Sequence, residues 1–226
     1  MYRRLAAALF SVSVSFAITA STQSANTTIL FVDAAAAANG DGRSERPFVR
    51  ITDALDRARA IRRDSAAPID IQVGPGVYVG SYTNTGSTIE LLPIRLDVSH
   101  LKLIGTTKME KDESGLPTGV ITRNSNTLLL AEPPLEGMQS ILALSSPNVT
   151  VENLSFNAGS GHGGWVVRVD QVQDFTLVNN YVTGGSTDSA MASTSVAPRE
   201  KSSATMSCAV VAAFVSSQTK YLRLWK

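Results

Sequence analysis

The chain has 226 residues, of which 43% are hydrophobic and 17% charged, a balance typical of a folded protein and not of a wholly disordered one. Its 20 basic and 19 acidic residues give a formal net charge of +1, which is too small to neutralise a phosphate backbone, so no nucleic-acid partner is expected. Cys208 is the single cysteine, which excludes an intramolecular disulfide. The two histidines, His100 and His162, have no cysteine near them, and we predict no metal site.

The first 25 residues have the layout of a secretory signal peptide. Arg3 and Arg4 precede an apolar stretch over residues 5–20, and small polar residues follow as far as Ala25. A membrane anchor is the alternative, but the stretch contains several serines and is shorter than the roughly 20 apolar residues that span a bilayer. We therefore predict that residues 1–25 are removed on export, that no membrane span remains, and that the protein is extracellular or periplasmic.

Residues 26–68 are expected to form a strand, a loop and a helix. An apolar run over residues 29–33 predicts the strand, and the Asn-Gly-Asp-Gly sequence at residues 39–42 predicts a turn. Apolar residues then recur at the spacing of one helix face, at Ile51, Ala54, Leu55, Ala58 and Ile61. Thr52 is expected to cap this helix, and Asp53 lies at its positive end.

Beyond residue 68 the helical spacing ends and short β-branched runs replace it. Strands are predicted at residues 69–73, 101–104, 119–122, 141–144, 149–151, 166–169 and 175–177. Residues 149–153 superpose on 175–179 at a shift of 26, and residues 141–144 on 166–169 at a shift of 25. Such a period favours stacked coils with an inward Asn153 above Asn179, although a β-sandwich also has short strands at regular intervals.

Two stretches of sequence resemble a known family. FVDAAAAANGDGRSERPFVRITDALDRARA followed by IDIQVGPGVYVG resembles the N-terminal region of secreted pectin-lyase-like proteins, and VTVENLSFNAG and FTLVNNYVTGG resemble the repeated coil of that family. The matching positions in the first stretch are Val32, Asp33, Gly40, Asp41, Pro47, Phe48, Ile51, Ala54, Leu55, Val73, Pro75, Gly76 and Tyr78. The likeness extends from about residue 29 to about residue 185.

The resemblance implies an all-β protein, a right-handed parallel β-helix (solenoid) over residues 69–185 with one N-terminal capping α-helix. It implies a secreted monomer that is carbohydrate-active or carbohydrate-binding, with a polysaccharide as its partner. Family members include lyases, hydrolases and adhesins, so the fold leaves the reaction open, and a non-catalytic surface or adhesin-like module is the alternative. Calcium is a cofactor in this family, but the six to eight oxygen ligands that it needs are not visible here, and we predict no cofactor.

The last segment, residues 186–226, departs from that pattern. It is rich in Ser, Thr and Ala as far as residue 204, and an apolar stretch follows at residues 208–215. Such low-complexity sequence does not readily stack as a coil, and we expect no coil there. A truncation or a change of reading frame is the favoured explanation, and a divergent cap of the solenoid is the alternative.

Candidate site residues lie near one predicted strand. Alternation over residues 166–170 points Arg168 and Asp170 outward, as catalytic candidates or as a surface ion pair, and we expect them to be the one outward pair of opposite charges on a predicted strand. His162 and Trp165 are candidates for substrate binding, since an aromatic ring can stack on a sugar; a glycine-rich turn with an exposed histidine is the other interpretation. One coil earlier, the equivalent positions are Ala143 and Ser145, which supply no second carboxylate. We therefore expect an incomplete active site, and no activity from this chain alone.

Overall fold

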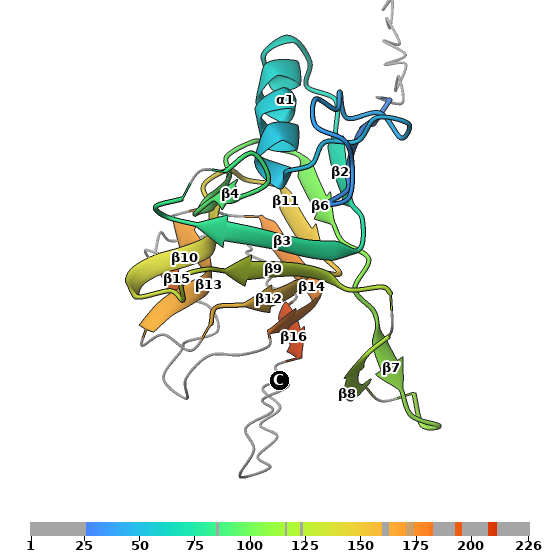
Figure 1. Cartoon of the computed structure of the whole chain (residues 1–226), viewed down its shortest axis with the longest axis vertical. Coiled ribbons are helices and arrows are strands. Elements are labelled where there is room, and N and C mark those ends of the chain that lie inside the picture. The colour runs from blue at the N-terminus through green and yellow to red at the C-terminus, as the bar shows by residue number, and fades with distance from the viewer. Residues whose placement is uncertain are drawn as a thin grey trace, which may run out of the picture.

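The computed structural model describes residues 26–84, 86–115, 117–122, 124–159, 163–170, 172, 174–182, 193–195 and 208–211. The predicted signal peptide at residues 1–25 and the candidate His162 lie outside these ranges. One helix, α1 (Ile51–Asp64), and sixteen strands are found within them, and most strand pairs are parallel (Figure 1). No helix in this part of the chain is long and apolar enough to cross a membrane.

The largest sheet combines strands from widely separated parts of the chain. Along it lie β1 (Thr28–Val32), β2 (Ile69–Val73), β6 (Leu101–Ile104), β11 (Val149–Glu152), β14 (Phe175–Val182), β12 (Ser155–Asn157), β9 (Thr127–Ala131), β3 (Gly76–Ser81) and β4 (Glu90–Leu91). Every pairing along this path is parallel. The described chain is therefore a mainly β structure of parallel strands with a single helix.

A second sheet is also parallel throughout. It contains β5 (Ile94–Leu96), β10 (Gly137–Leu144), β13 (Gly163–Asp170) and β15 (Ser193–Ser195), paired in that order. β15 and β16 (Cys208–Val211), which pairs with β14, lie in the segment for which the sequence predicted no coil. Both strands extend the parallel pairing of the strands before them.

The strand registers confirm both sequence superpositions. Val149 pairs with Phe175 and Val151 with Leu177, the predicted shift of 26. Leu142 pairs with Val167, the predicted shift of 25. Strand β11 is parallel to both of its neighbours, β6 and β14, and not joined to them as antiparallel hairpins.

One predicted strand has a different role. Residues 119–122 were expected to pair in parallel with the other strands, but most of them belong to β8 (Pro117–Ile121), which pairs antiparallel with β7 (Met109–Lys111). Figure 1 shows this hairpin projecting away from the two larger sheets. The prediction was wrong because alternating β-branched residues have the same pattern in a hairpin and in a stacked strand.

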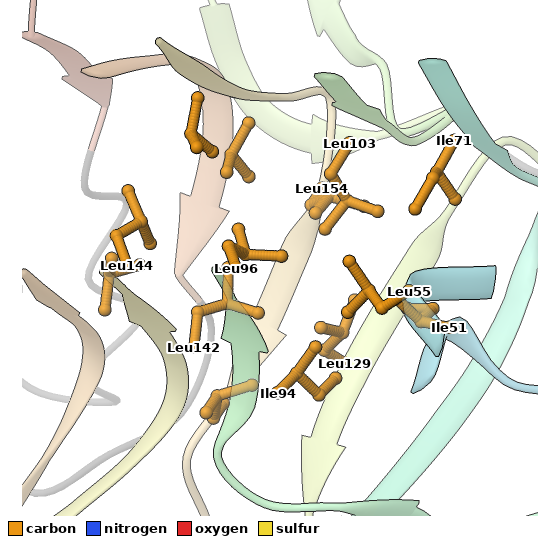
Figure 2. Packing of buried hydrophobic residues seen from close by; sticks show 14 of the residues in the cluster. Ile51, Leu55, Ile71, Ile94, Leu96, Leu103, Leu129, Leu142, Leu144 and Leu154 are labelled. Atoms are coloured by element: carbon orange, nitrogen blue, oxygen red, sulfur yellow. The ribbon is translucent and has the colours of Figure 1, made fainter. Parts of the chain in front are cut away.

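The core consists of columns of like residues. Ile71, Leu103, Val151 and Leu177 occupy aligned positions on β2, β6, β11 and β14, and each is 5% exposed or less. Figure 2 shows Ile71 and Leu103 with Ile94, Leu129 and Leu142 converging on the same interior. Each of these strands buries its apolar side chains against those of the neighbouring strands.

The predicted asparagine ladder is wrong in its residues. Asn153 and Asn179 both have left-handed backbones, with φ of 58° and 52°, but Asn179 is exposed and Asn153 only half-buried. Asn180 is the buried amide, 6% exposed. Its Oδ1 accepts from the Leu154 N–H at 3.1 Å and its Nδ2 donates to the Val151 carbonyl at 2.8 Å. Because the backbone is left-handed at Asn179, the side chain that points inward is that of the next residue, Asn180.

Helix α1 lies at one end of the stacked strands, where the sequence predicted a cap (Figure 1). Leu55 is completely buried, as expected, and the helix packs against β1, β2, β4 and β5. Thr52 does not cap the helix, because the cap position is Arg50, whose side chain makes no capping bond. Glu90 on β4 does this instead: its carboxylate accepts from the Ile51 N–H, and from the Thr52 N–H and hydroxyl at 3.0 and 2.8 Å.

Candidate functional site

Strand β13 positions the two catalytic candidates as the alternation predicted. Val167 and Val169 are 4% and 2% exposed and face the core, so Arg168 and Asp170 face outward. The Arg168 Nε lies 3.0 Å from the Asp170 Oδ1, and the two side chains are 33% and 44% exposed. The structure therefore shows a partly solvated ion pair on the outer face of the second sheet, and such pairs interact weakly.

Strand β5 carries the same arrangement, which the sequence analysis missed. Leu96 of β5 and Val169 of β13 both pair with Leu144 of β10, so the two outer strands present equivalent residues on either side of β10. Arg95 aligns with Arg168 through Ala143, and Asp97 follows Leu96 as Asp170 follows Val169. The structure therefore adds a second outward Arg–Asp arrangement, beside a strand that the sequence analysis did not predict.

A sequence signal for β5 existed. Ile94-Arg95-Leu96-Asp97 has the same apolar-Arg-apolar-Asp order as Val167-Arg168-Val169-Asp170. The strand has only three residues, which is too short for alternation to be recognised. It also follows Pro93, which lacks the N–H that a regular strand uses for pairing.

Arg95 and Arg168 differ in their ion-pair partners, because the aspartate near Arg95 is bound by helix α1. Arg59 of α1 reaches across to β5, where its Nε donates to the Asp97 Oδ1 at 2.8 Å. Burial opposes its charge, but the hydrogen bonds to Asp97 and Asp56 outweigh this and raise the pKa of Arg59. Asp97 is therefore engaged by the helix, and the exposed guanidinium of Arg95 has no ion-pair partner among the described residues.

A small residue separates the two arginines. Ala143 lies between them on β10 and is 4% exposed. Neighbouring strands lie about 4.8 Å apart, so the backbones at Arg95 and Arg168 are separated by roughly 10 Å. Two cationic side chains thus flank a small residue on one face of a parallel sheet, a spacing that lets one extended anionic chain contact both.

Trp165, one of the two substrate-binding candidates, does not join this face. Trp165 is half-buried, and alternation along β13 puts it on the same side as Val167 and Val169, opposite to Arg168. It is aligned with the fully buried Ser140 of β10. His162 lies outside the described residues.

Other titratable groups serve the fold. Tyr78 is 3% exposed, and its hydroxyl accepts from the Ala34 N–H and donates to the Gly74 carbonyl, both at 3.1 Å. Burial is the main reason that the pKa of Tyr78 is raised. Across the described ranges, no group of three or more His, Cys, Asp and Glu side chains comes together that could hold a metal ion.

Comparisons with known proteins give one distant likeness. No protein-family model matches the chain, and no curated protein matches it. Among solved structures, the chain is similar to a "Rhamnogalacturonan lyase" with 13% sequence identity and a TM-score of 0.39, over 70% of this chain and 39% of that one. The chain thus spans about two fifths of that lyase, and a likeness at this level carries no conclusion about fold or activity.

Proposed function

We propose that this chain is an exported right-handed parallel β-helix protein that binds an acidic polysaccharide on the outer face of β5, β10 and β13. The parallel registers at shifts of 25 and 26 support successive coils. Crossovers between parallel strands of one sheet are right-handed in nearly all proteins, which supports the hand. The arginines and apolar stretch within residues 1–25 support export.

The pair Arg95 and Arg168 is the observation that carries the binding proposal. Guanidinium groups bind carboxylates through two parallel hydrogen bonds and are always charged. Arg95 has no ion-pair partner among the described residues, and Arg168 can exchange Asp170 for a carboxylate of the ligand. A polymer with regularly repeated carboxylates could therefore contact both strands across Ala143.

The proposal assigns binding, and no catalytic step, to this face. β-Elimination from a uronate needs a base close to the neutralised carboxylate. The two carboxylates on the face, Asp97 and Asp170, are each paired with an arginine. Arginine also stays protonated and is a poor base.

Binding of fluorescently labelled polygalacturonate to the purified protein tests the proposal. Arg95→Ala and Arg168→Ala are each expected to weaken binding by about two- to fivefold, as exposed charge pairs do, and added salt should weaken it further. Lys102→Ala is the matched control. Lys102 is exposed on β6 of the other sheet, and its substitution also removes one positive charge.

Equal losses in all three variants would show that net charge alone attracts the polymer, and would overturn the assignment of the site. The same samples are to be followed for the absorbance of unsaturated products, with and without calcium. Turnover that Arg168→Ala or Asp170→Ala abolishes would show an active site where the proposal places a binding site.

A further inference from the structure

The loop between β1 and α1 borders three hollows that share lining residues. The first, of about 270 Å³, lies over the outer face of β1, β2 and β6. The second, of about 360 Å³, shares Asp33, Ser44 and Pro47 with it. The third, of about 450 Å³, shares Asn39 and Gly40 with the second and reaches Arg50 at the start of α1. The three hollows adjoin the same loop and share lining residues, and we call them together the loop groove.

The floor of the first hollow combines an aromatic ring with polar groups. Phe31, Gln72 and Ile104 are aligned on β1, β2 and β6 and face outward. Gln72 is exposed, so both ends of its amide are open to a ligand. Asp33 stands at the side of the hollow, and its Oδ1 accepts from the Ala35 N–H at 2.8 Å, which leaves Oδ2 available.

This combination selects a neutral polyhydroxy ligand. A sugar ring has an apolar face that packs on an aromatic ring and an equatorial rim of hydroxyls that pair with amide and carboxylate oxygens. Among the described residues that line the first hollow, none is cationic, and Asp33 repels an anion. In the second hollow, the single cation, Arg46, is already paired with Asp41 at 3.5 Å.

The walls of the loop groove are held in place before any ligand arrives. The Phe31 N–H donates to the Gly42 carbonyl at 2.9 Å, and the Phe48 N–H donates back to the Phe31 carbonyl at 2.9 Å. Gly42 has a φ of 84°, and a Cβ there would clash with the ring of Phe48. A site that is already ordered loses little conformational entropy on binding.

We propose that the loop groove binds a neutral oligosaccharide, with one sugar ring on Phe31 and the following units along the second and third hollows. The row of adjoining hollows favours a chain over a single sugar. Neither Arg95 nor Arg168 lines the loop groove, and the proposal does not depend on the function proposed for their face.

Calorimetric titration with cellohexaose, mannohexaose and β-1,4-galactohexaose tests the proposal. At least one of these probes is expected to bind, and Gln72→Ala and Phe31→Ala should each raise its Kd by about fivefold or more through the lost hydrogen bonds and ring contact. Asp70→Asn is the matched control, because Asp70 faces the same side of β2 but does not line the hollow.

Two further variants separate this site from the arginine face. Arg95→Ala and Arg168→Ala should leave hexaose binding unchanged, and Gln72→Ala should leave polygalacturonate binding unchanged. Because Phe31 is half-buried, Gln72→Ala decides the matter if Phe31→Ala does not fold. Absence of binding by all three hexaoses at millimolar concentration, or an unchanged Kd in Gln72→Ala, would overturn the proposal.

Discussion

The N-terminal region and the later stacked strands are stabilised by different kinds of interaction. In the N-terminal region, single polar side chains bridge long stretches of sequence: Glu90 caps α1, Tyr78 bonds to Ala34, and Arg59 pairs with Asp97. In the later strands, aligned apolar residues such as Leu103, Val151 and Leu177 stack on one another. The end of the stack is thus held by bonds that occur once, and its body by apolar contacts that recur along the parallel strands.

This difference has a physical origin. A strand in the body has a neighbour above and below that supplies the same apolar surface and backbone pairing. The terminal strands lack one neighbour, so α1 must cover them, and the N–H groups of its first turn need acceptors from outside the helix. Mutations in the body and at the end should therefore fail in different ways.

Val151→Asp is expected to have the largest effect. Val151 is completely buried between Leu103 and Leu177, so the substitution places an unpaired charge in the stack. A cost of about 4 kcal/mol or more would prevent stable folding. Far-UV circular dichroism and soluble yield measure this.

Thr150→Asp is the control for that change, because Thr150 is the adjacent, outward position on β11 and only half-buried. It should fold and unfold nearly as the wild type does. Equal damage from both variants would contradict the assignment of Val151 to the interior.

Glu90→Ala should destabilise the end of the stack without removing the body. The change leaves the Ile51 and Thr52 N–H groups without their acceptor in a site where Glu90 is 1% exposed. Two buried donors without an acceptor make the expected loss in unfolding free energy about 3 kcal/mol, measured by urea denaturation. Glu110→Ala, on the exposed face of the β7–β8 hairpin, should change it by less than about 0.5 kcal/mol. Equal effects of the two variants would remove Glu90 from its capping role.

The recurring part of the fold was predictable from sequence, and the single bonds were not. The shifts of 25 and 26 and the apolar face of α1 leave periodic patterns, which local sequence carries. Glu90 lies 39 residues beyond Ile51, in a two-residue strand, and nothing in its neighbourhood indicates that it caps a helix. The periodic pattern also predicted the buried amide at Asn179. A left-handed backbone at that residue moves the buried position to Asn180, and the pattern gives no sign of such a turn.

The candidate site was predictable to the same extent. Arg168 and Asp170 were found because β13 is long enough to alternate visibly. Arg95 and the following Asp97 were missed because strand β5 is short, and Arg59 because its contact with Asp97 joins residues 38 positions apart. The hollows of the loop groove arise from the path of the loop, which composition does not specify.

Asn180→Ala compared with Asn179→Ala tests the position of the amide. Loss of the Asn180 side chain leaves the buried Leu154 N–H and Val151 carbonyl without those partners, which should lower the unfolding free energy by about 2 kcal/mol. Asn179 is exposed with a φ of 52°, so its replacement should cost about 1 kcal/mol, through backbone strain alone. The reverse order of the two effects would restore the predicted ladder at Asn179.

The smallest expected effect is the pH dependence that Glu90 confers. Burial raises the pKa of Glu90 above its ordinary value of 4.5, and the bonds from Thr52 and Ile51 and the charge of Arg50 offset this only in part. The folded state therefore holds a proton that the unfolded chain releases near pH 4.5, so the contribution of Glu90 to stability is complete below that pH and is lost as the pH rises through the folded pKa.

The difference in unfolding free energy between wild type and Glu90→Gln isolates this contribution, because glutamine keeps the side-chain shape and does not titrate. The difference should be most favourable to the wild type near pH 4 and should decline toward pH 7, by at most about 1.4 kcal/mol per pH unit for one proton. Urea titrations across that range measure it. A difference that grew with pH would mean that the helix N–H groups and Arg50 outweigh burial, and that the carboxylate is held in its charged form at the end of the stack.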